Sequence, residues 1–183
     1  MLIVPTVLVA LLAGTARDVL ARLKHKTVNI LGDVGLNNDV PHVMAKKRTI
    51  AQEVEKAAVL LQKLVRLNAA NELGFAHCVT CGCFKHWKQL QGGHFISRGH
   101  LSTKLTEENV HPQCQDCNAF KMKDNLTILE YRRFMVDMYG DDEVKAMEQL
   151  ARQPKKYNRA EVADIVADFK VQIKRHEERL KGF

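Results

Sequence analysis

The stretch NVHPQCQDCNAFK, residues 109–121, decides how the middle of this 183-residue chain folds. It carries Cys114 and Cys117, and a matching pair, Cys78 and Cys81, stands earlier in the chain. Two residues between cysteines let both thiolates point at one ion, and two such pairs complete the closed four-thiolate site typical of structural zinc. The spacing therefore predicts a zinc site that holds both ends of the intervening segment. Since four thiolates leave no position for water, a catalytic metal would have to lie elsewhere.

The fifth cysteine, Cys83, is interpreted as a bystander, because four ligands already saturate a structural site. A redox role for one pair is the alternative, but two pairs without a strand–helix–strand pattern favour metal. All five cysteines lie within 40 residues, whereas the cysteines of a disulfide framework are usually spread along a short secreted chain. Their clustering therefore indicates a reducing compartment. We therefore expect a cytoplasmic protein.

The formal net charge of +7 favours an anionic partner, nucleic acid before a membrane surface. The apolar run from Leu2 to Ala13 lacks a preceding basic residue and is short for a membrane span, so we expect no membrane partner. Three interpretations of residues 1–43 stay open: an extension upstream of a natural start at Met44, a small packed segment, or a signal or anchor.

Helical periodicity flanks the cysteine-rich centre. Apolar residues recur at helical spacing in residues 44–74, which predicts an amphipathic basic helix. Residues 126–183 predict further helices: Thr127 and Glu130 form a capping-box pattern, and Gly140 is a plausible stop. Asn158, with Glu161 three residues later, predicts the start of the last helix. The segment 75–125 between these parts would be the functional core.

That core resembles the HNH nucleases, which have a ββα-metal motif. The family pattern is a histidine ending one strand, an asparagine before the next, then a Cys-x-x-Cys-Asn-x-x-Lys segment entering a helix. The corresponding stretches here are GGHF at 92–95, Asn109-Val110, and CQDCNAFK at 114–121. The resemblance implies an α+β fold: a small ββα-metal motif with a four-cysteine zinc ribbon, flanked by mostly helical segments.

Within that superfamily the chain is similar to the NinG (Rap) recombination proteins of lambdoid phages. The similarity rests on CVTCG at Cys78, GGHF at Gly92, ENVHPQCQDCN at Glu108, and NLTILEYR at Asn125 with YGDDEVKAMEQ after it. It implies a structure-selective endonuclease that acts on branched DNA recombination intermediates. A homodimer would suit branched substrates with two-fold character.

The resemblance also implies site roles. His94 would be the general base, Asn109 would orient His94 or its loop, and Asn118 would give an oxygen ligand to Mg²⁺ or Mn²⁺. Phosphate contacts are expected from three basic residues: Arg98, Lys104 and Lys121.

One position departs from the HNH pattern, because Gly93 stands where an acidic or other ligand commonly precedes the histidine. Gln91, His100 and His111 are candidates for the missing ligand, although His111 can also be a packed residue. This departure keeps two other functions open: a zinc-ribbon DNA-binding recombination accessory protein without nuclease activity, and a structural zinc protein with an unrelated partner.

Overall fold

The computed structural model describes residues 48–182, so the expectations for residues 1–43 lie outside the described part. The α+β class is confirmed, since helices surround two small antiparallel sheets. In chain order the elements are α2 (Ile50–Ala69), β1 (Phe75–His77), β2 (Phe84–His86), η1 (Trp87–Gln89), β3 (Leu90–His94), α3 (Leu101–Lys104), η2 (Glu107–Asn109), β4 (Val110–Cys114), η3 (Asp116–Lys121), α4 (Asn125–Tyr139), α5 (Asp141–Leu150) and α6 (Arg159–Arg179).

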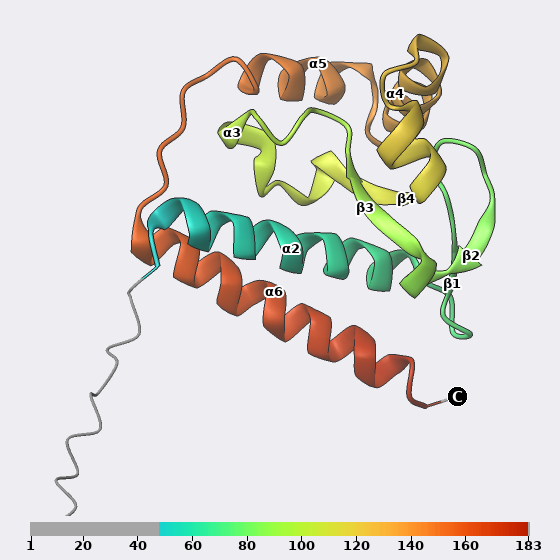
Figure 1. The fold of residues 1–183 in the computed structure, drawn as a ribbon, viewed down its shortest axis with the longest axis horizontal. Helices are drawn as coiled ribbons and strands as arrows, with labels where there is room; N and C mark the ends of the chain where they lie inside the picture. The colour runs from blue at the N-terminus through green and yellow to red at the C-terminus, as the bar shows by residue number, and fades with distance from the viewer. Residues whose placement is uncertain (1–47, 183) are drawn as a thin grey trace, which may run out of the picture. The chain divides into compact units, whose positions relative to one another are not determined.

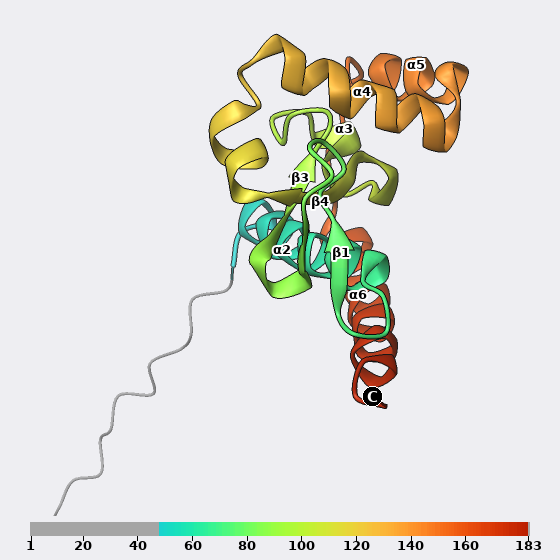
Figure 2. The same cartoon turned by 90° about the vertical axis from the view of Figure 1, so that its right-hand side faces the viewer.

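The sheet of β3 and β4 forms a middle layer between two helical layers, with α2 and α6 on one side and α4 and α5 on the other (Figures 1 and 2). The two strands pair antiparallel, with Leu90 opposite Cys114 and His94 opposite Val110. The sheet thus places a cysteine beside the start of β3 and His94 at the other end of the strand.

Strand β3 lies very close to α2, and glycine at position 92 permits this. A Cβ at Gly92 would fall 2.6 Å from the Cα of Gln62, closer than any side chain could tolerate. The Arg66 side chain on α2 fixes the same approach, because its Nη1 donates to the Leu90 carbonyl at 2.9 Å.

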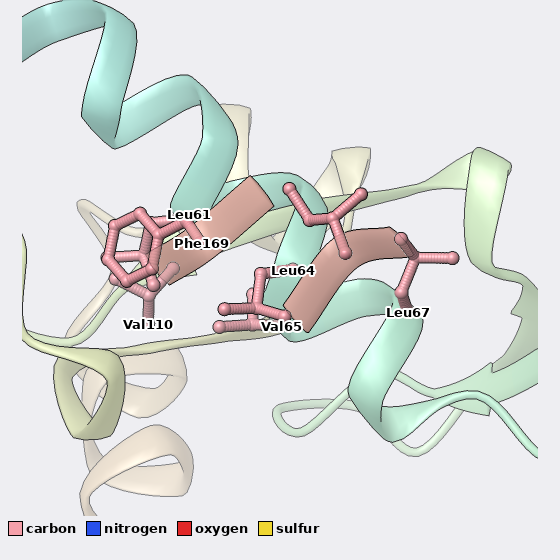
Figure 3. Close-up of a cluster of buried hydrophobic side chains, with 7 residues drawn as sticks. Leu61, Leu64, Val65, Leu67, Val110 and Phe169 are labelled. Atoms are coloured by element: carbon pink, nitrogen blue, oxygen red, sulfur yellow. The ribbon is translucent and has the colours of Figure 1, made fainter. Parts of the chain in front are cut away.

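Helices α2 and α6 run side by side in the same direction and form the main core (Figure 1). Arg159 at the start of α6 pairs with Glu53, and Lys63 pairs with Glu177 near its end at 2.7 Å. Figure 3 shows the apolar cluster between them and the sheet, which consists of Leu61, Leu64, Val65, Leu67, Val110, Phe169 and Ile173. Burial of these side chains is the largest favourable contribution to holding the two helices against β4.

The helix ends confirm one capping prediction and correct another. Asn158 and Glu161 form the expected capping box at the start of α6. The expected box at Thr127 is wrong: α4 begins at Asn125, and the Asp124 carboxylate caps it by accepting from the Thr127 N–H at 3.2 Å. Gly140, with φ of 87°, ends α4 as expected.

A second apolar cluster holds α4 and α5 against the sheet. Its buried members are Tyr131, Met135 and Val144. The Tyr131 hydroxyl donates to the Gly93 carbonyl at 2.8 Å, which fixes α4 to β3 beside the candidate site. Among residues 48–182, no helix has the length and apolar character needed to cross a bilayer.

Candidate metal centre and adjoining cleft

Cys78, Cys81, Cys114 and Cys117 come together as the sequence predicts. Their four sulfur atoms all lie within 4.8 Å of one another, and all but Cys81 are buried. Four sulfurs at this separation can surround one tetrahedral ion, and thiolate sets of this kind select zinc. The described residues thus contain a site able to hold a metal such as zinc.

Local backbone bonds shape each cysteine pair for this purpose. The Cys117 N–H donates to the Cys114 sulfur at 3.5 Å, and the Gly82 N–H closes the first pair by donating to the Cys78 carbonyl at 2.9 Å. The Val79 N–H donates to the Pro112 carbonyl at 2.9 Å, which joins the first pair to β4. The site therefore connects the β1–β2 hairpin to the β3–β4 sheet.

The thiols have unequal pKa values. Burial raises the pKa of Cys78 and Cys117. At Cys81 burial acts in the same direction, but hydrogen bonds with Cys83, Cys78 and Cys117 together outweigh it and lower the pKa to about 7. Neighbouring thiolates repel one another, so a divalent cation is what allows all four to ionise together. Cys83 packs against the cluster but does not belong to the set of four sulfurs that lie within 4.8 Å of one another.

A cleft of about 860 Å³ adjoins β3 and the segment after the second cysteine pair. His94, Arg98, Asn118, Gln91 and Arg66 are among the residues that line it. No Asp or Glu lines this cleft within the described part of the chain. Its walls are therefore cationic and neutral, which suits an anionic ligand.

His94 lies buried at the end of β3 with a defined tautomer. Its Nε2 is 3.1 Å from the Lys104 carbonyl oxygen, and a carbonyl can only accept, so Nε2 carries the proton and Nδ1 keeps a lone pair. Burial lowers the pKa of His94, against the opposing effect of the Lys104 carbonyl. The imidazole is thus held neutral near pH 7, as a base requires.

Asn109 is completely buried and holds the loop that follows His94. Its Oδ1 accepts from the Ile96 N–H at 2.7 Å, and its Nδ2 donates to the Ile96 and Thr103 carbonyls, each at 3.0 Å. The Phe95 N–H donates to the Asn109 carbonyl at 2.9 Å. One asparagine thereby fixes both ends of the segment 96–103, which directly precedes the Lys104 carbonyl bound to His94.

Asn118 follows Cys117 directly and faces the cleft. Its Nδ2 donates to Gln91 Oε1 at 2.6 Å, which leaves Oδ1 directed toward Gly93. Asn118 lies within η3, a π-helical segment, and such segments are frequent at functional sites. Two elements therefore set the orientation of this amide: η3 carries it and β3 binds it.

The three basic residues predicted to contact phosphate have different surroundings. Arg98 is exposed on the cleft. The Lys104 side chain is only 7% exposed and pairs with Glu55 on α2, which removes it from the surface that we expected. Lys121 is exposed but pairs with Asp116 at 2.5 Å and does not line the cleft, whereas Asn118, Ala119 and Met122 do.

Two of the candidates for the ligand missing at Gly93 lie elsewhere. His100 Nδ1 is 2.9 Å from the Ala151 carbonyl, next to α5. His111 is buried between two tyrosines, with Nδ1 3.1 Å from the Tyr131 oxygen and Nε2 2.9 Å from the Tyr139 oxygen. His111 is therefore a packed residue, the second of the two alternatives above. Only Gln91 lines the cleft, where it holds Asn118.

Two further residues at this site carry no signal in the sequence. Arg66 lines the cleft from α2, a helix with the amphipathic pattern of an ordinary scaffold element. Gln113 lies fully buried beneath Gly93. Its inward orientation follows from the pairing of β3 with β4, and a polar residue in a buried strand is the only hint that the sequence contains.

No curated protein and no solved structure is significantly similar to this chain. The family model described as "Bacteriophage Lambda NinG protein" matches residues 42–179, which include every element described above. The chain therefore belongs to the bacteriophage lambda NinG protein family.

Proposed function

We propose that this protein is a metal-dependent DNA endonuclease that acts on branched recombination intermediates. One observation carries the proposal: His94, with Nε2 bonded to a carbonyl, shares a cleft with Asn118, whose position is set by the adjoining cysteine cluster. Membership of the NinG family favours a role in phage recombination. The family resemblance supplies the branched substrate.

His94 would act as the general base of phosphodiester hydrolysis. Its Nδ1 takes the proton of a water molecule as that water attacks phosphorus, and the new imidazolium keeps its Nε2–H bond to the Lys104 carbonyl. Asn109 keeps this carbonyl in place through the Thr103 and Ile96 carbonyls that it binds. A bound Mg²⁺ or Mn²⁺ would stabilise negative charge on the reacting oxygens.

The basic side chains would hold the DNA backbone. Arg98 is the exposed basic residue on the cleft, and its guanidinium can bind phosphate oxygens in a bidentate manner. Lys121, the last residue of η3, is exposed and could exchange its contact with Asp116 for phosphate. We leave Lys104 out of this set because its side chain is buried and paired with Glu55.

A cleavage assay with matched histidine variants tests the proposal. Zinc-loaded protein is mixed with a four-way junction and with linear duplex of the same sequence, in Mg²⁺, Mn²⁺ or EDTA. We expect junction cleavage that needs the divalent ion, and a loss of about 10²–10⁴-fold in His94→Ala. His86→Ala, which alters a histidine outside the cleft, should cleave like the wild type; equal rates for His94→Ala would refute the assignment.

A DNA-binding accessory protein without nuclease activity is the second candidate. Gly93 favours it, because no acidic side chain stands before His94. This alternative predicts that the wild type binds junctions tightly but leaves them intact in both metal ions.

A further inference from the structure

Gly93 leaves a space that a side chain from the neighbouring strand fills. A Cβ at position 93 would lie 1.8 Å from Gln113 Oε1 and 3.0 Å from Asn118 Oδ1. Two amide oxygens from different elements therefore surround the point at which an acidic side chain at position 93 would begin. The place of the missing ligand is occupied by amide oxygens even though Gly93 itself has no side chain.

Gln113 is buried in a way that leaves its oxygen without a partner. Its side chain is fully buried, and Nε2 donates to Thr80 Oγ at 2.6 Å and toward Met122 Sδ at 3.5 Å. Oε1 is buried and has no hydrogen-bond partner among the described residues. An unsatisfied buried oxygen destabilises a protein, and it calls for an explanation such as a bound ion.

Asn118 presents its oxygen to the same place. Because Nδ2 donates to Gln91, the amide is oriented with Oδ1 toward Gly93. Thr80 fixes the Gln113 amide just as Gln91 fixes that of Asn118. In each amide, the hydrogen bond donated by the nitrogen thus fixes the direction in which the oxygen points.

We propose that Gln113 Oε1 and Asn118 Oδ1 are two ligands of one divalent cation, with Gln113 taking the place of an acidic residue at position 93. The inference rests on the proposed nuclease function and names the ligand which that function lacks. Amide oxygens are hard ligands that suit Mg²⁺ and Mn²⁺, with metal–oxygen distances of about 2.0–2.2 Å. Both oxygens lie 3.0 Å or less from one point beside Gly93, where a single ion would be held between them.

The neutrality of these ligands has a consequence for binding. Among the described residues no carboxylate lines the cleft, and Arg66 and Arg98 add positive charge to it. A cation receives little electrostatic stabilisation there until an anionic phosphate arrives. Metal and DNA should accordingly bind together, each strengthening the other by the same factor.

Manganese binding measured by electron paramagnetic resonance tests this coupling. The full zinc-loaded chain carries His94→Ala to prevent cleavage, and free Mn²⁺ is measured with and without four-way junction DNA. We expect junction DNA to increase Mn²⁺ affinity at least tenfold. Gln113→Met should abolish most of that increase, whereas Gln113→Glu should increase Mn²⁺ affinity without DNA at least tenfold.

A ligand swap separates metal binding from packing. Gln113→Ala should lose the coupling, and Gly93→Asp together with Gln113→Ala should restore it, because the carboxylate then enters the space that the glutamine vacates. Zinc content and circular dichroism check the fold of each variant. Folded Gln113→Met and Gln113→Ala proteins that bind Mn²⁺ like their parent would overturn the inference.

These experiments separate a failure of the metal site from a failure of the nuclease proposal. If the His94-intact protein cuts no DNA but Mn²⁺ binding depends on Gln113, the metal site stands and the nuclease function falls. If the protein cuts junctions and the Gln113→Met variant cuts and binds Mn²⁺ equally well, the nuclease function stands and the Gln113 site falls.

Discussion

At the scale of single residues, polar side chains buried beside the sheet define the candidate site. The roles expected for Asn109 and Asn118 came from their place in a motif, and both occupy positions compatible with those roles. Gln113 and His111 could not be placed from the sequence. The partner of a polar residue on β4 depends on which later segments pack against that strand. Here these are α4, which brings Tyr131 to His111, and the end of η3, after which Met122 reaches Gln113.

His111 makes protein stability depend on pH. The Tyr131 hydroxyl donates to Gly93, so it can only accept from Nδ1–H of His111, and Nε2 accepts from Tyr139. Neutral imidazole is thus fully bonded, and burial lowers the pKa of His111 from 6.5 to about 4. Below pH 6.5 His111 binds a proton in the unfolded chain but not in the folded chain. The free energy of unfolding therefore falls as pH decreases towards 4.

We expect this residue to contribute a loss of about 2 kcal/mol between pH 7 and pH 5. Urea unfolding of the wild type and of His111→Gln at both pH values measures it. The variant should lose less stability than the wild type over this interval by that amount. Equal losses in the two proteins would contradict the prediction.

At the scale of elements, local sequence signals were sufficient where one residue controls an end. Asn158 and Glu161 cap α6 as expected, because both partners lie within one turn. The failure at Thr127 is equally local: Asp124 stands three residues earlier and supplies a carboxylate to the first turn of α4. The four-cysteine site could be predicted because Cys-x-x-Cys spacing determines its own geometry, whereas the burial of Lys104 and its pairing with Glu55 need α3 to pack against α2.

Substitution of the cysteines should separate the four clustered thiols, which zinc binding needs, from Cys83, which it does not need. Cys114→Ser should abolish zinc binding and melt the centre of the chain, because a structural zinc site contributes about 10–16 kcal/mol, comparable with the whole stability of a domain. Cys83→Ser should keep one zinc per chain. A chromogenic chelator and circular dichroism measure both, and loss of zinc from the Cys83 variant would mean that this thiol is a ligand.

At the scale of the whole molecule, the fold decides where the basic residues lie and which face of the sheet each helix covers. The net charge of +7 has no specific location in the sequence, but the structure places Arg98 on the cleft that also contains His94. The three-layer arrangement was not predictable, since helical periodicity does not say which face of the sheet each helix covers.

Salt dependence of DNA binding tests the location of the interface. Arg98→Ala should weaken junction binding and reduce the slope of log K against log salt by about 1, the effect of losing one phosphate contact. Lys174→Ala changes another exposed basic residue, on α6 in another layer, and should leave the slope unchanged. Fluorescence anisotropy at several salt concentrations gives both slopes, and identical behaviour of the two variants would place the interface elsewhere.

The pairing of α2 with α6 has a consequence for how the protein is made. A ribosome produces α2 first and α6 last among the described elements, so the apolar face of α2 stays uncovered while the cysteine-rich centre emerges. Contacts this distant along the chain form slowly, and exposed apolar surface promotes aggregation in the meantime. Completion of the fold therefore waits until α6 has been synthesised, and a product that stops before residue 159 would display the surface that Phe169 and Ile173 normally cover.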